Sequence, residues 1–155
     1  MDYSKLQNGS DIRGVALEGI EGQHINLTEQ ASRDIGRGFA LWLMEKTGKK
    51  TLSVAVGRDS RLSGLTLSGW ICDEMAKQGL CVPDFGMAST PAMFMATVAD
   101  GCSYDGTVMI TASHLPLTAT VLSSLPPVAA WKRRISSRSS PLPQVRRPRA
   151  WRLLL

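Results

Sequence analysis

Two hydroxyls and an imidazole occur together in the segment 111–114, which reads T-A-S-H. The segment directly follows an apolar stretch, 107–110, that we expect to form a strand. In a loop after a strand, backbone N–H groups can converge on an anion, so Ser113 and His114 are candidate site residues together with Thr111. Taken alone, the pattern is also compatible with a serine that only caps a turn and a histidine that is a simple polar loop residue.

A second polar segment, 57–61, reads G-R-D-S-R and follows another apolar stretch, 52–56. The guanidinium groups of Arg58 and Arg61 can each bind phosphate oxygens bidentately, and Asp59 can orient one of them. The alternative is an ion pair between Arg58 and Asp59 that only stiffens the turn.

A third segment, 10–14, reads S-D-I-R-G and adds Arg13 and the hydroxyl of Ser10. The chain around these segments alternates short apolar runs with helical patterns, as βα units do, so we predict an α/β fold. Polar loops that leave such a sheet can open at the same edge, where ligands bind in open α/β sheets. Hydroxyls and arginines at one edge suit phosphoryl transfer, which depends on positioning and on stabilising charge on oxygens.

The elements that must position these loops can be placed from hydrophobic periodicity and end signals. A helix should begin after an N-cap at Asn26, or alternatively at Thr28, and end at Gly48. The other expected elements, in chain order, are strand 52–56, helix 64–77, strand 80–82, a helix with Thr90 as N-cap and Pro91 as its first residue that reaches about 98, and strand 107–110.

The three segments, in this order, resemble the first domain of the α-D-phosphohexomutases, the phosphoglucomutase and phosphomannomutase enzymes. The resemblance covers about residues 8–116 and implies a three-layer α/β/α domain with a mixed, mostly parallel sheet, so that 1–116 is the expected domain. One small departure is Leu115, where asparagine is common in the family.

The resemblance also implies roles for individual residues. Ser113 would be the phosphoserine that donates its phosphoryl group to a hexose phosphate, such as glucose or mannose phosphate, through a hexose 1,6-bisphosphate intermediate. His114 would lie near the phosphoserine and substrate. The positions that match the family's remaining catalytic arginine and its phosphate-binding or substrate-binding residues are Arg13, Ser10, Arg58, Asp59, Arg61 and Thr111.

Several parts that the family uses are missing from this sequence. No lysine acid/base occurs in 117–127, and the magnesium-binding D-G-D-x-D loop and the sugar-selecting loop of later domains are absent. Mg²⁺ would therefore keep only the phosphate of Ser113 as a ligand here, without its carboxylates. We expect a truncated chain that is inactive or barely active alone.

The segment 117–155 differs in composition from the rest. It holds eight Lys and Arg and no acid, whereas 1–116 holds ten against 13 acids. With five prolines and six serines in 39 residues, it is expected to be disordered and foreign to the family, arising from a changed reading frame or a retained intron.

Two alternative functions remain open at this stage. The chain could be a non-catalytic module that binds a phosphosugar or a partner, or 132–152 could bind nucleic acid or an anionic membrane surface. We favour neither, and expect no nucleic acid and no membrane partner. Because no secretory signal and no long apolar run is visible, we expect an intracellular protein, cytoplasmic or in an organelle such as a plastid. The three cysteines are expected to be buried free thiols.

Overall fold

A mixed six-stranded sheet organises the chain, with the strand order β1-β2-β6-β5-β3-β4. The structure, a computed structural model, describes residues 3–8, 11–19, 22–102, 104–112 and 119–125. Its elements are the 3-10 helix η1 (Ser4–Leu6), β1 (Gln7–Asn8), β2 (Asp11–Val15), α1 (Glu29–Thr47), β3 (Val54–Arg58), α2 (Gly64–Lys77), β4 (Asp84–Met87), α3 (Thr90–Met95), β5 (Gly106–Thr111) and β6 (Ala119–Leu125).

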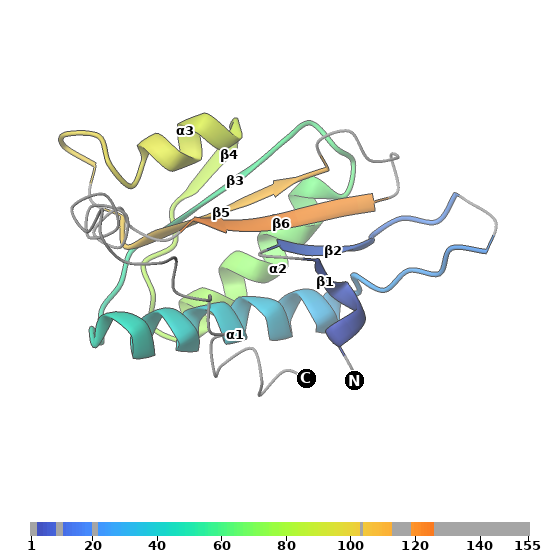
Figure 1. The fold of residues 1–155 in the computed structure, drawn as a ribbon, viewed down its shortest axis with the longest axis horizontal. Helices are drawn as coiled ribbons and strands as arrows, with labels where there is room; N and C mark the ends of the chain where they lie inside the picture. The colour runs from blue at the N-terminus through green and yellow to red at the C-terminus, as the bar shows by residue number, and fades with distance from the viewer. Residues whose placement is uncertain (1–2, 9–10, 20–21, 103, 113–118, 126–155) are drawn as a thin grey trace, which may run out of the picture.

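Three layers are formed, with α1 and α2 on one face of the sheet and α3 on the other (Figure 1). The larger core lies between the sheet and the two long helices, and includes Phe39, Leu43, Ile71, Val56 and Ile110. A smaller cluster joins α3 to the opposite face through Ala55, Met93 and Met109. Helices cover both faces of the central strands, and the first four residues of β3, 54–57, are uncharged and buried. The predicted three-layer α/β/α class is confirmed.

Strand direction explains how a mixed sheet arises. The pairs β3–β5 and β3–β4 are parallel, whereas β5–β6, β2–β6 and β1–β2 are antiparallel. Because β6 is antiparallel to both of its neighbours, β2 runs in the same direction as β5. The carboxyl ends of β2, β3, β4 and β5 therefore all lie along the same edge of the sheet, the one that runs across the strands.

The strand β6 lies inside a stretch for which we predicted disorder. Residues 119–125, orange in Figure 1, pair with β5 on one side and β2 on the other. Leu122 stands opposite both Ile110 and Ile12, and all three side chains are buried. The prediction was wrong for this strand because the charge and proline content, averaged over 39 residues, conceals an uncharged run of seven, A-T-V-L-S-S-L. Residues 126–155 lie outside the described part of the chain.

The start of α1 follows the second of the two N-cap predictions. Thr28, rather than Asn26, is the N-cap and accepts a hydrogen bond from the Ala31 N–H at 3.2 Å. Asn26 instead accepts from the backbone N–H of Val15 at 2.7 Å and so closes the loop after β2. Gly48 ends α1 in the left-handed region, as predicted.

After β4, Ser89 rather than Thr90 is the N-cap of α3. The strand predicted at 80–82 is only a single bridge, Ser53 to Cys81, and β4 begins at Asp84. The strand β4 was missed because it is a largely exposed edge strand and carries no continuous apolar signal.

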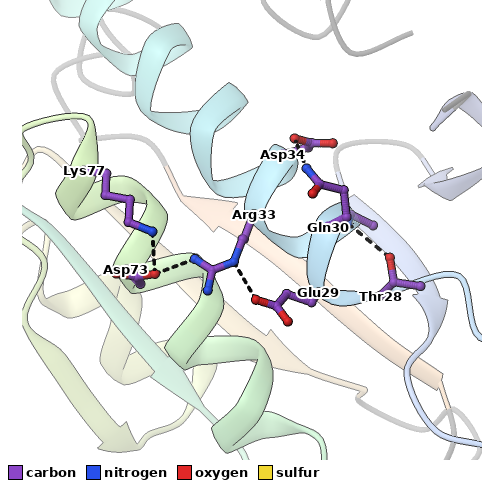
Figure 2. A network of polar contacts seen from close by, with 8 residues as sticks. Thr28, Glu29, Gln30, Arg33, Asp34, Asp73 and Lys77 are labelled. Atoms are coloured by element: carbon purple, nitrogen blue, oxygen red, sulfur yellow. Dashed lines mark hydrogen bonds and ion pairs between the residues drawn. The ribbon is translucent and has the colours of Figure 1, made fainter.

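The helices α1 and α2 pack closely and are joined by charges at their surface. Arg33 of α1 bonds to Glu29 one turn earlier and to Asp73 of α2, which also accepts from Lys77 (Figure 2). These bonds, led by that from Arg33, hold the pKa of Asp73 below its ordinary value. A Cβ on Gly36 would lie 3.1 Å from the Ile71 carbonyl oxygen, so a side chain here would require the two helices to move slightly apart.

Cys72 is partly buried, and burial raises its pKa to about 11. Cys81 and Cys102 are exposed free thiols, contrary to the expected burial.

Among the described helices, none combines the length and the apolar character required to cross a bilayer.

Tyr3 gives the fold a predictable response to alkaline pH. Its hydroxyl donates to Asp34 of α1 at 2.6 Å, and burial followed by this bond raises the pKa of Tyr3 from 10.0 to about 12. Because the folded state favours the protonated phenol, the stabilisation is complete below pH 10 and is lost as pH rises towards 12. In urea unfolding at pH 8 and pH 11.5, wild-type protein should lose more stability than Tyr3→Phe. Tyr104→Phe, which retains Tyr3, should follow wild type; equal losses in wild type and Tyr3→Phe would contradict the assignment.

Candidate functional site

Three of the predicted site residues lie at the same edge of the sheet. Thr111 is the last residue of β5 and stands opposite Val121 of β6, which stands opposite Arg13 of β2. Arg58 is the last residue of β3 and stands opposite Ile110 of β5. With neighbouring strands about 4.8 Å apart, the backbones of Arg13 and Thr111 are separated by about 10 Å. The sheet therefore brings the described parts of all three polar segments together.

Three other candidates, Ser113, His114 and Ser10, lie outside the described residues. Their described neighbours mark where the chain enters these segments. Ala112 immediately precedes Ser113 and is fully buried. Asp11 follows Ser10 at the start of β2.

Asp59 connects the loop that follows β3 to the residues that follow β5. Its backbone N–H donates to the Ile110 carbonyl oxygen at 3.0 Å, which extends the parallel ladder by one bond. One carboxylate oxygen, Oδ2, accepts from the backbone N–H of Ala112 at 3.1 Å. The other, Oδ1, accepts from the backbone N–H of Arg61, also at 3.1 Å. A single carboxylate thus fixes both its own loop and the residue before Ser113.

The arginines of the β3 exit have different environments. The Arg61 side chain is 14% exposed, and its Nε lies 3.8 Å from Asp59 Oδ2. An ion pair between Arg58 and Asp59 was the alternative considered from the sequence; among the described residues the ion pair with Asp59 is made by Arg61. The Nε of Arg58 is buried and has no hydrogen-bond partner in the described part of the chain. Arg13 is 41% exposed and lies 3.6 Å from Asp11.

A second contact near this edge was not foreseen from the sequence. Ser63, at the N-terminus of α2, shares a hydrogen bond of 3.2 Å with Thr120 of β6, and both side chains are buried. No sequence motif marks either residue, and 119–125 was expected to be disordered. Recognising the uncharged, β-branched run that forms β6 could have placed Thr120 on a strand.

Each of the two strand segments that carry an arginine has a glycine with a packing role. A Cβ on Gly14 would lie 2.5 Å from Asn26 Oδ1, and a Cβ on Gly57 would lie 2.5 Å from Met93 Sδ. The absence of a side chain at Gly57 therefore allows α3 to approach β3 directly before Arg58.

The described residues contain no group of three or more His, Cys, Asp or Glu that could hold a metal ion.

Comparison with known proteins agrees with this architecture. Residues 4–122 match the family model described as phosphoglucomutase/phosphomannomutase, alpha/beta/alpha domain I. The chain belongs to this family. The match continues into β6, so the phosphohexomutase domain does not end at 116 and the family sequence extends into the segment we had taken as foreign to it.

Individual relatives support the same assignment. A phosphoglucomutase/phosphomannomutase of Thermococcus kodakarensis is 36% identical over 112 residues, which are 72% of this chain and 22% of the relative. A phosphoglucomutase of Neisseria gonorrhoeae is 39% identical over 106 residues, 68% of this chain and 20% of the relative. The crystal structure of a phosphoglucomutase/phosphomannomutase family protein from Burkholderia thailandensis matches with a TM-score of 0.59 and 29% identity, over 83% of this chain and 29% of that one. The chain thus spans about a fifth of the length of the curated phosphohexomutases that it matches.

Substitution of Gly57 tests whether the β3 exit depends on close packing against α3. Gly57→Ala should lower the free energy of unfolding by about 1–3 kcal/mol, because the added methyl group overlaps Met93 and Ala88. Gly69→Ala is the matched control: this exposed glycine lies within α2 with open space around it, so alanine should be neutral or stabilising by up to about 1 kcal/mol. Urea unfolding measures both, and a Gly57→Ala protein as stable as Gly69→Ala would exclude the packing role.

Proposed function

We propose that this chain is the phosphate-carrying first domain of a phosphohexomutase, with Ser113 as the residue that accepts and donates the phosphoryl group. The observation that carries the proposal is the hydrogen bond from Ala112 to Asp59, which holds the residue before Ser113 beside the arginine-bearing exit of β3. The family assignment supports the same role.

The proposed reaction is a reversible phosphoryl transfer. The bond from phosphorus to Ser113 Oγ breaks as a hydroxyl oxygen of a hexose phosphate bonds to phosphorus, and the hydroxyl proton leaves to a base. The resulting hexose 1,6-bisphosphate turns around, and its other phosphate returns to Ser113. The substrate class is glucose or mannose phosphate, in keeping with the names of the relatives.

The arginines would act by binding phosphate oxygens. Arg58 is suited to this because its buried Nε has no hydrogen-bond partner among the described residues, and a buried donor without an acceptor costs about 1–3 kcal/mol. Arg13 is suited because its exposed guanidinium group can contact a ligand at the same edge. In this proposal Thr111 and Ser10 assist in binding phosphate or substrate, and His114 lies near the phosphoserine.

Magnesium is the ion that the family implies, and the described residues do not fit it. They contain no metal-binding group of acids, histidines or cysteines, and the D-G-D-x-D sequence does not occur in the chain. We therefore propose that Mg²⁺ binds only with the help of carboxylates from outside this chain. Loss of one electrostatic contact at a transition state costs about 10²–10³ in rate, so the chain alone should show negligible mutase turnover.

Phosphate on Ser113 is the first expected result. One slow transfer per molecule is enough to load the serine, whereas turnover requires many. After prolonged incubation with glucose 1,6-bisphosphate, tandem mass spectrometry should find phosphate on Ser113 in wild type. Ser60→Ala, which removes the exposed serine of the G-R-D-S-R loop, should load equally, and Ser113→Ala should not load. A wild-type protein without phosphate, or an equally loaded Ser113→Ala, would contradict the proposal.

Turnover of the isolated chain is the second measurement. A coupled assay with glucose 1-phosphate or mannose 1-phosphate should detect no conversion above that of Ser113→Ala. Conversion at rates typical of enzymes, about 1 per second or faster, would refute the predicted inactivity.

A further inference from the structure

The β3–α2 loop, residues 59–63, contacts one described residue on each side of the segment 113–118: Ala112 before it and Thr120 after it. Asp59 Oδ2 accepts from the backbone N–H of Ala112 at 3.1 Å, on the β5 side of the segment. The Ser63 and Thr120 hydroxyl oxygens lie 3.2 Å apart on the β6 side. A loop of five residues therefore provides a hydrogen bond to each end of the connection between β5 and β6.

The length of this connection explains why external contacts matter. The last ladder pair of the antiparallel strands β5 and β6 is Thr111 with Val121, which leaves nine residues between them. Hairpin loops usually have two to five residues and take their shape from one tight turn. Contacts to other segments therefore help to define where its two ends lie: Ala112 bonds to Asp59, and Thr120 pairs with Gly14 of β2 and also bonds to Ser63.

The contact to β6 is buried, and the contact to Ala112 is partly buried. Ser63 and Thr120 are 4% and 1% exposed, and Ala112 is fully buried, whereas the Asp59 side chain is 28% exposed. Hydrogen bonds in such an environment are stronger than those exposed to solvent. The bond from Arg61 to the second oxygen of Asp59 also fixes the carboxylate relative to its own loop.

We infer that Asp59 and Ser63 are positioning residues, which set the place of the phosphate-carrying serine by holding Ala112 and Thr120. Neither residue needs to touch substrate for this role. The inference rests on the proposed function of Ser113, and it gives the G-R-D-S-R loop a second task beside phosphate binding.

The test compares the rate at which glucose 1,6-bisphosphate loads phosphate onto Ser113 in variants of the full 155-residue chain. Asp59→Ala should slow loading by about tenfold or more, because a misplaced reacting group loses orientation. Asp59→Asn should restore part of the rate, since one amide oxygen can replace one of the two carboxylate acceptors. Asp84→Ala is the matched control: the Asp84 side chain accepts the same type of bond from the N–H two residues ahead, that of Gly86, and among the described residues it makes no side-chain hydrogen bond to another segment, so loading should be unchanged.

The contact to β6 has its own variants. Ser63→Ala and Thr120→Val should each slow loading, by about threefold or more, and the double variant should be no slower than the slower single one, because both remove the same bond. Additive losses, or single variants that load at the wild-type rate, would overturn the role of Ser63.

Amide hydrogen exchange separates failure of this inference from failure of the proposed function. Exchange at Ala112 should be about tenfold faster in Asp59→Ala, while exchange at Val56 in the core stays unchanged and shows that the variant is folded. If wild type loads phosphate and Asp59→Ala loads equally fast, the positioning role is wrong and the proposed function stands. If wild type takes no phosphate, the proposed function is wrong, and unchanged exchange at Ala112 in Asp59→Ala would overturn the positioning contact as well.

Discussion

The hydrogen bond from the Ala112 N–H to the Asp59 carboxylate is the contact on which the candidate site depends. The strands β3 and β5 pair in parallel up to Arg58 and Ile110, after which β3 turns away towards α2. Ala112 is buried at this point, so its N–H needs an acceptor that the ladder no longer offers. A carboxylate with two oxygens can satisfy this donor and one in its own loop, and so couples two strand exits that are 53 residues apart in sequence.

The sheet brings the other site residues to the same edge through its topology. Because β6 is antiparallel to both β5 and β2, the strand that carries Arg13 ends beside the strands that carry Arg58 and Thr111. The helices α1 and α2 bury one face of this sheet, and α3 approaches the other where Gly57 has no side chain. The hydrogen bond between the Ser63 and Thr120 hydroxyls then joins the N-terminus of α2 to β6.

Sequence patterns predicted much of the fold and part of the site. The apolar face of 64–77 predicted α2, and the glycine at 48 predicted the end of α1. The apolar runs before the two polar loops predicted β3 and β5. The exposed strand β4 and the uncharged strand β6 were not predicted, because neither has a continuous apolar run that distinguishes it from the neighbouring sequence. The contacts Asp59 with Ala112 and Ser63 with Thr120 could not be predicted, since each depends on how strands distant in sequence align.

The most direct test of this account is an NMR measurement of scalar coupling across the hydrogen bond between the Ala112 backbone nitrogen and the Asp59 side-chain carboxyl carbon. A cross-peak that links these two nuclei in the isotope-labelled chain, and that disappears in Asp59→Ala but persists in Asp84→Ala, is the predicted result. An Ala112 amide that couples to a different acceptor, or that exchanges with water as fast as an exposed amide, would contradict the claim that Asp59 holds Ala112, the residue before Ser113.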